Sequence, residues 1–259
     1  MNAIAERALR GERLSDVHTI DWHVHLGKWV TMHMPGQGEE LIRRAKALGI
    51  SKLVVNGTKW PDLRASNDAV AAFAANHPDI VIGFAVANPY QNGMADEVRR
   101  CFDELGFRGL KLHSFFETYH SARGISSYTR EWDAVFAVVA ERHMPVLYHG
   151  VVTEAMVRNW PGIPFVAAHG IASVATMEKM TAYPNFHVDT AASQNVAWCV
   201  TTGAEILGAD RILWGTDAPL ADFAQRLGVV LDSGLPEEDI RKILGLNAAR
   251  LLGLTLRSV

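Results

Sequence analysis

Short apolar runs and amphipathic segments alternate along the chain and predict a series of strand–helix units. Strand-length apolar runs are found at 19–26, 50–56, 80–87, 107–113, 145–149, 165–169, 185–190 and 211–216. Between them, apolar residues recur at helical spacing in 39–48, 69–76, 94–105, 129–142, 154–159, 174–181 and within 195–207. Three more helical segments are predicted at 221–231, 237–244 and 247–251. The pattern therefore predicts eight strands, each followed by a helix.

This order of elements favours an α/β protein whose parallel strands are joined by crossover helices. Eight such units in 259 residues favour a single TIM (β/α)8 barrel with extra C-terminal helices. The alternative is an open doubly wound sheet, but no Gly-x-Gly-x-x-Gly turn follows the first strand. We expect one domain over residues 1–259, in which residues 1–15 form an N-terminal extension with a short surface helix.

Composition and charge narrow the classes of function. The hydrophobic content of 49% fits a large core, and no apolar run approaches the length of a membrane span. A net charge of -3 and the lack of a basic stripe argue against a nucleic-acid partner. Cys101 and Cys199 are too few for a disulfide framework and are expected to be buried, reduced thiols in a cytoplasmic protein.

Polar residues follow directly after several of the apolar runs. In a TIM barrel these positions lie at the C-terminal ends of the strands, where the active site is built. His23 and His25 alternate within the first run, so they point to the same face and form half of a metal site. An isolated His-x-His pair is a weak signal, but further polar residues end the later runs: Lys111, His113, His149, His169 and Asp217.

These motifs, in this order, resemble those of the amidohydrolase superfamily. They are His-x-His at 23–25, Gly-Leu-Lys-Leu-His at 109–113, His-Gly at 149–150, Ala-His-Gly at 168–170 and Gly-Thr-Asp-Ala-Pro at 215–219. More narrowly, the chain resembles the amidohydrolase-related (amidohydrolase 2) family, which includes non-oxidative decarboxylases of the aminocarboxymuconate-semialdehyde and resorcylate types. The stretch 243–252 resembles the C-terminal helix of that family, so the resemblance covers residues 20–252.

The resemblance implies a single divalent metal held by His23, His25, His149 and Asp217. Imidazoles and one carboxylate suit Zn²⁺, with Mn²⁺ or Fe²⁺ as alternatives. Such a metal activates water and polarises a carbonyl group. Asp217 would be the catalytic base, and His169 would lie beside the metal as a further ligand or as an acid/base. The lysine that resembles Lys111 is carbamylated in some binuclear relatives. Here we expect Lys111 to be unmodified and either to be buried or to hold a substrate anion, with a structural ion pair as the alternative.

The predicted loops after strands one, two and four carry aromatic and cationic residues. They suit a small organic acid or lactone, although most of these aromatic residues could simply pack the loops onto the barrel. The candidate substrate-binding residues are Lys111, His113, Trp29, Trp60 and Arg64, and Asp189 is a lower-ranked candidate for lining the pocket. Asp21 is expected to support the metal ligands from behind or to pack the barrel rather than to bind the metal. The remaining histidines, including His187, are expected to be mostly structural, although His33 and His120 lie on loops from which they could approach a substrate.

The first prediction for function is a metal-dependent hydrolase that cleaves a lactone, ester or amide of a small organic acid. The alternative is a metal-dependent non-oxidative decarboxylase of a small carboxylic acid, aromatic acids included. A barrel that keeps a metal only for stability is disfavoured, because structural metal sites are closed rather than built across several strand ends. The family resemblance also makes a homodimer or higher homo-oligomer an expectation.

Overall fold

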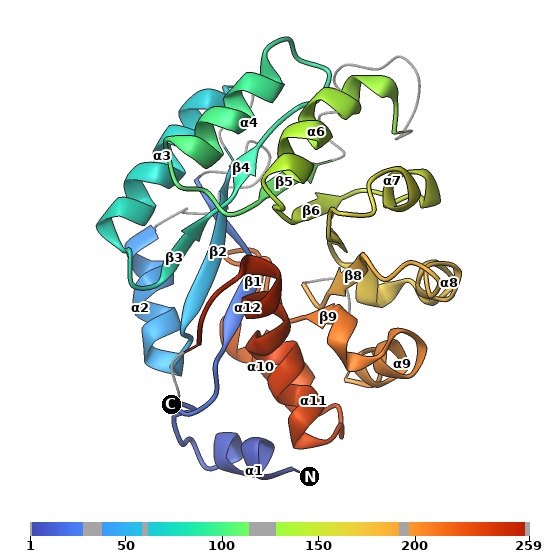
Figure 1. Ribbon diagram of the computed structural model, residues 1–259. Helices are drawn as coiled ribbons and strands as arrows, with labels where there is room; N and C mark the ends of the chain where they lie inside the picture. Colours follow the sequence, from blue (N-terminus) through green and yellow to red (C-terminus); the bar gives the residue numbers. More distant parts are fainter. Residues whose placement is uncertain (1, 28–37, 59–61, 114–127, 192–196, 257–259) are drawn as a thin grey trace.

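The computed structural model describes residues 2–27, 38–58, 62–113, 128–191 and 197–256 (Figure 1). Helix α1 (Ala3–Leu9) precedes the first strand, and its N-terminus is capped by Asn2, whose side chain accepts a hydrogen bond from the backbone N–H of Ala5. No helix in these ranges is long and apolar enough to cross a membrane. The described part of the predicted N-terminal extension is thus a short helix and the turn that follows it.

Strands and helices then alternate through the rest of the chain (Figure 1). The strands are β1 (Ile20–Leu26), β2 (Lys52–Gly57), β3 (Val81–Gly83), β4 (Ala85–Val86), β5 (Leu110–His113), β6 (Val146–His149), β7 (Phe165–Ala167), β8 (Phe186–Asp189) and β9 (Ile212–Leu213). The helices are α2 (Gly38–Leu48), α3 (Leu63–Asn76), α4 (Met94–Asp103), α6 (Asp133–Glu141), α7 (Glu154–Asn159), α8 (Val174–Lys179), α9 (Trp198–Leu207), α10 (Phe223–Leu231), α11 (Glu237–Arg241) and α12 (Asn247–Leu252). Short 3-10 turns occur at Arg130–Trp132, Gly170–Ala172 and Ala209–Arg211, and a π-helical turn at Lys242–Leu246.

The strands form a closed barrel. All strand pairs are parallel, in the orders β1-β2-β3 and β4-β5-β6-β7-β8-β9. Strands β3 and β4 are two halves of one strand that is interrupted at Phe84, whose N–H donates to the carbonyl of Val55 in β2. At the other seam, β1 bonds to the segment after β9, where the N–H of Trp22 donates to the carbonyl of Trp214 at 2.9 Å. The expected TIM barrel is therefore confirmed.

Side chains alternate between the inside of the barrel and its helical layer. In β6 and β7, for example, Leu147 and Val166 belong to the inner apolar cluster, and Val146 and Phe165 to the outer one. The inner cluster also contains Ala248, Ala249 and Leu252, so α12 covers the N-terminal mouth of the barrel. Apolar side chains therefore fill the inside of the barrel, its N-terminal mouth and the layer beneath the helices. The polar side chains of the candidate site lie at the opposite, C-terminal mouth.

Three differences between the structure and the predicted elements have a clear physical cause. Helix α3 begins at Leu63 rather than at residue 69, because Asp62 caps it by accepting from the N–H of Ala65. Strand β9 is short, because the chain beyond Leu213 turns to pair with β1. The segments predicted as two C-terminal helices, 237–244 and 247–251, are one continuous helix joined by the π-helical turn, in which Gly245 packs against the carbonyl of His18.

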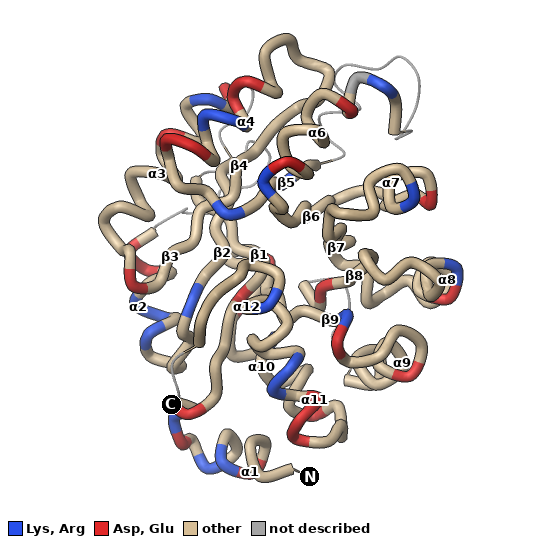
Figure 2. The backbone as a smooth tube through the Cα atoms, in the orientation of Figure 1, with Lys and Arg blue, Asp and Glu red and all other residues tan. Residues whose placement is uncertain are grey.

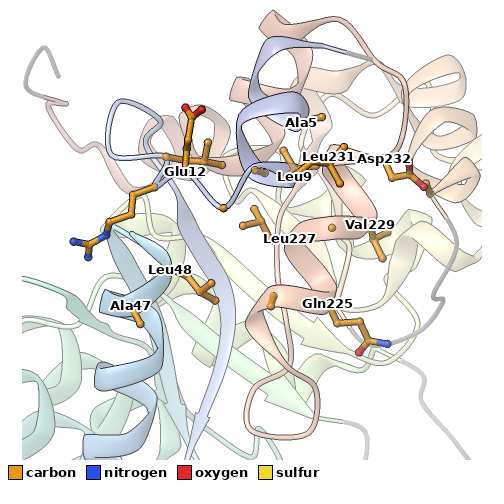
Figure 3. A pocket seen from close by; sticks show the side chains of 17 residues that line it. Ala5, Leu9, Glu12, Ala47, Leu48, Gln225, Leu227, Val229, Leu231 and Asp232 are labelled. Carbon is orange, nitrogen blue, oxygen red and sulfur yellow. The ribbon is translucent and has the colours of Figure 1, made fainter.

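The outer surface gives little indication of function. Lys and Arg are interspersed with Asp and Glu over the outer helices that Figure 2 shows. A hollow of about 620 Å³ lies between α1, α2 and α10 and is lined largely by apolar side chains such as Leu9, Leu48 and Leu227 (Figure 3). None of its lining residues belongs to the histidine cluster. Cys101 and Cys199 are buried and free, as expected.

Candidate metal centre and active site

Three of the predicted metal ligands meet at the C-terminal mouth of the barrel. The Nε2 atoms of His23 and His25 are 3.2 Å apart, and Oδ1 of Asp217 lies 2.9 Å from Nε2 of His25 and 3.3 Å from Nε2 of His23. His23 is completely buried, and His25 and Asp217 are 2% and 6% exposed. We refer to these three residues as the triad.

The triad fits a divalent metal. Donor atoms 2.9 to 3.3 Å apart would subtend angles of roughly 90° to 105° at a metal with bonds of about 2.1 Å, between octahedral and tetrahedral values. Burial, followed by the nearby charge of Lys111, holds the pKa of His23 well below its usual range, and burial also lowers the pKa of His25. Both imidazoles are therefore neutral at neutral pH, the form that ligates metals.

Asp217 is ionised beside these rings. Burial alone would raise the pKa of its carboxyl group, but the adjacent His23 and the hydrogen bond from His25 outweigh burial and hold the pKa well below its usual range. Asp217 has a φ of 67°, a left-handed conformation that Asp tolerates better than most residues. Its N–H donates to the carbonyl of His23 at 2.8 Å, so the turn after β9 and strand β1 place the ligands together.

Asp21 has a structural role in this junction. Its carboxylate accepts hydrogen bonds from the N–H of His23 at 3.0 Å and from the N–H and hydroxyl of Thr216 at 3.0 and 2.6 Å. The register of β1 shifts between Asp21 and Val24, which is a bulge in the strand. Asp21 therefore does not continue the row of His23 and His25 as simple alternation predicts, but joins β1 to the residue before Asp217.

Lys111 lies against the triad. Its Nζ is 2.7 Å from Nε2 of His23, and the side chain is 1% exposed. Burial lowers the pKa of Lys111 to about 8. A Cβ at Gly215 would lie only 3.0 Å from Cβ of His23, so the chain after β9 approaches β1 closely at the same point. The structure thus places a cation, predicted to hold a substrate anion, beside the three ligands.

Three further histidines, His113, His149 and His169, form a wall of the candidate site next to the triad. His169 has its ring centre 5.2 Å from that of His23 and 4.6 Å from that of His149, whose ring centre is 4.1 Å from that of His113. Burial, followed by the charge of Lys111, lowers the pKa of His149 to about 3. Burial, followed by His149, holds the pKa of His113 well below its usual range. His149 lies in this wall rather than in the close triad, so its role as a fourth ligand stays a prediction.

Three of the predicted substrate-binding residues are not brought to this cluster by the described structure. Arg64 is on α3, where its guanidinium pairs with Glu97 of α4 at 2.9 Å and its side chain is 63% exposed. Trp29 and Trp60 lie outside the described residues. Lys111 and His113 are therefore the members of that set that the structure places beside the metal ligands.

Asp189 has a more important position than the sequence indicated. It ends β8, is completely buried, and its Oδ2 lies 2.9 Å from Nδ1 of His23. A carboxylate at the end of the seventh strand of the barrel was visible in the sequence, but its partner was not. The contact depends on the barrel bringing together residues 166 positions apart.

Comparisons with known proteins agree with the fold and the motifs. A model of the amidohydrolase family, of the amidohydrolase-2 type, matches residues 20–254. No curated protein sequence matches the chain significantly.

Several solved structures share the fold at low sequence identity. A 2,6-dihydroxybenzoate decarboxylase in complex with 2,6-dihydroxybenzoate aligns with a TM-score of 0.72 and 18% identity, over 92% of this chain and 98% of that chain. A 5-carboxyvanillate decarboxylase from Sphingomonas paucimobilis aligns with a TM-score of 0.73 and 14% identity, over 92% and 100% of the two chains. A dihydroxybenzoic acid decarboxylase from Polaromonas sp. JS666, with bound manganese and 2-nitroresorcinol, aligns with a TM-score of 0.73 and 18% identity, over 93% and 98%. With the family model covering nearly the whole barrel, the chain belongs to the amidohydrolase family.

Proposed function

We propose that the protein is a metal-dependent carboxy-lyase that removes CO₂ from a small hydroxylated aromatic acid. The observation that carries the proposal is the buried triad of His23, His25 and Asp217 with the Lys111 cation beside it. The choice of reaction is supported by similar structures, which include enzymes that decarboxylate dihydroxybenzoate and carboxyvanillate. This reverses the order expected from the sequence, in which hydrolysis came first.

The residues of the cluster have distinct tasks in this reaction. His23, His25 and Asp217 would hold the metal, with His149 as the predicted fourth ligand. When bound, the metal supplies positive charge that polarises a substrate oxygen and stabilises negative charge there. Lys111, being buried beside the triad, is placed to attract the anionic substrate.

Decarboxylation requires a proton carrier. The bond between the ring carbon and the carboxylate breaks, CO₂ leaves, and the electron pair stays on the ring carbon, which then takes a proton. Nδ1 of His169 lies 3.0 Å from the carbonyl of Ala191, an acceptor only, so Nδ1 carries a proton and Nε2 is the ring atom through which a proton can be exchanged. We assign His169 as the carrier, which accepts a proton from the substrate hydroxyl or solvent and delivers one to the ring carbon.

Hydrolysis of a lactone or other derivative of a small organic acid remains the second candidate. The observation in its favour is the ionised state of Asp217, which suits a base that takes a proton from an attacking water. The two candidates share the metal site and differ in the bond that breaks.

A substrate screen tests the proposal. The protein is treated with a chelator, dialysed, and reloaded separately with Zn²⁺, the metal expected from the ligands, with Mn²⁺, which similar enzymes bind, and with Fe²⁺. Dihydroxybenzoates, carboxyvanillate and a panel of lactones are assayed for CO₂ by mass spectrometry and for acid release by pH-stat titration. Metal-dependent CO₂ release in equal amount to decarboxylated product supports the proposal.

The other outcomes are equally informative. Acid release from lactones without CO₂ would establish the hydrolase instead. Turnover by protein shown to contain no metal would contradict both candidates. The same preparations, analysed by light scattering, would test the expected homodimer.

A further inference from the structure

The end of β8 contacts two of the histidines that matter for the proposed site. Asp189 accepts hydrogen bonds on Oδ1 from the backbone N–H groups of His169 at 2.6 Å and of Ala191 at 3.1 Å. Its Oδ2 lies 2.9 Å from Nδ1 of His23. The carboxylate is completely buried, and these three donors satisfy its two oxygens.

The contact with His23 decides which ring nitrogen carries the proton. A carboxylate is an acceptor only, so Nδ1 of His23 must be the protonated nitrogen. Nε2 then carries the lone pair of the ring, which accepts from Nζ of Lys111, and it is Nε2 that faces His25 and Asp217. This is the tautomer that can bind a metal at the triad.

The hydrogen bond between Asp189 and His169 stabilises an unusual backbone conformation of His169. His169 has a φ of 60°, in the left-handed region that histidine seldom adopts. The hydrogen bond from its N–H to Asp189 and that from its Nδ1 to the carbonyl of Ala191 both come from the chain at the end of β8. One short segment therefore orients the first metal ligand and the predicted proton carrier.

A second metal held by His23, His169 and Asp189 is the competing explanation, because these three groups also lie close together. It is disfavoured because Nδ1 of His23 and both oxygens of Asp189 are already engaged with one another or with backbone N–H groups. A metal bound through these atoms would compete with those hydrogen bonds.

We propose that Asp189 is a positioning residue which keeps the proton of His23 on Nδ1 and holds His169 in its left-handed turn. It acts through these two histidines. The proposal rests on the metal site of the proposed function, but its first consequence, the position of the proton, is present in metal-free protein and can be measured separately.

The test is Asp189→Asn, which keeps the shape of the side chain. The amide oxygen can still accept from His169 and Ala191, but the amide nitrogen would face Nδ1 of His23 as a donor and so favour the tautomer with the proton on Nε2. The ¹⁵N shifts of the His23 ring, assigned with His23→Gln, report the tautomer in metal-free protein. Competition with a chelator for Mn²⁺ and Zn²⁺ reports affinity.

We expect the proton of His23 to move to Nε2 and metal affinity to fall about 10- to 100-fold, the usual effect of losing such a partner. Glu97→Gln is the matched control, since Glu97 is also a buried carboxylate but lies on α4, where it pairs with Arg64 of α3 and with Arg100. It is expected to lower stability and to leave metal affinity and the His23 tautomer as in the wild type.

Several results would overturn the proposal. They are wild-type metal affinity in Asp189→Asn, an unmoved proton in that variant, or an equal loss of affinity in Glu97→Gln. If Asp189→Asn does not fold, the wild-type spectrum still decides, because a proton on Nε2 of His23 contradicts the proposal directly. Failure of the wild type to bind any metal would instead refute the proposed function, and the spectrum would still report the tautomer.

Discussion

His187 allows a quantitative test of how burial acts in this barrel. It is on β8, two residues before Asp189, and is 3% exposed. Burial, followed by the charges of Arg250 and Arg211, lowers its pKa to about 4, while a hydrogen bond to the carbonyl of Asn185 opposes the shift. His187 therefore stays neutral in the folded protein at a pH where it is already protonated in the unfolded chain.

The sign and size of the effect follow from this difference. The unfolded state takes up the proton near pH 6.5 and the folded state only near pH 4. His187 therefore makes its full contribution to the free energy of unfolding above pH 6.5, and this contribution is lost as the pH decreases to 4. Since a shift of one pKa unit corresponds to about 1.4 kcal/mol, the free energy of unfolding decreases by about 3 kcal/mol through His187. Below pH 4 its contribution changes no further.

Urea unfolding of metal-free protein between pH 4 and 7.5 measures this loss. The buried histidines of the triad add a slope of the same sign, so the wild type is compared with His187→Gln, which keeps a polar side chain but does not titrate. The stability difference between the two proteins should shift by about 3 kcal/mol in favour of the variant as the pH falls from 7 to 4. Parallel pH profiles would show that the reasoning about this side chain is wrong.

Three further predictions test the packing and the site. Gly245→Ala should cost about 3 kcal/mol, because its Cβ would come within 2.1 Å of a backbone carbonyl, whereas Gly228→Ala, with no atom within 4 Å, should gain about 0.5 to 1 kcal/mol in urea unfolding. Thr216→Val should cost about 2 kcal/mol by removing the hydroxyl bonded to a buried carboxylate of β1, and Thr216→Ser should restore most of it in the same assay. Asp217→Asn should abolish turnover yet retain more metal than His23→Ala does by elemental analysis. Equal metal loss in both would argue against Asp217 as a base.

Much of the architecture could be predicted from the sequence because the alternation of strands and helices is strong. Helix α7, for example, has the bounds expected from its pattern, Glu154–Asn159. Where the end of a helix or strand is set by a cap or a tertiary contact, its position could not be predicted. The early start of α3 depends on Asp62 as a cap, and the short β9 results from the chain leaving its neighbour to pair with β1.

The candidate site was predictable in part for a similar reason. His23, His25 and Asp217 follow apolar strands, and a barrel necessarily brings such strand ends to one rim. The bulge in β1, which turns Asp21 toward Thr216, has no signal in a period-two pattern. The pairing of Asp189 with His23 is a contact between strands distant in sequence, so the carboxylate could be noticed but its partner could not.

The seam between β1 and the segment after β9 has a consequence for how the protein is made. His25 and Asp217 meet across this seam although 192 residues separate them in the chain. A metal shared by them would act as a removable cross-link between the first and last strands, the kind of clip whose effect on the unfolded chain is greatest for long loops. During synthesis, a nascent chain that has not yet reached Asp217 carries the two histidines without the third ligand. Metal capture would then follow barrel closure and mark the completion of folding.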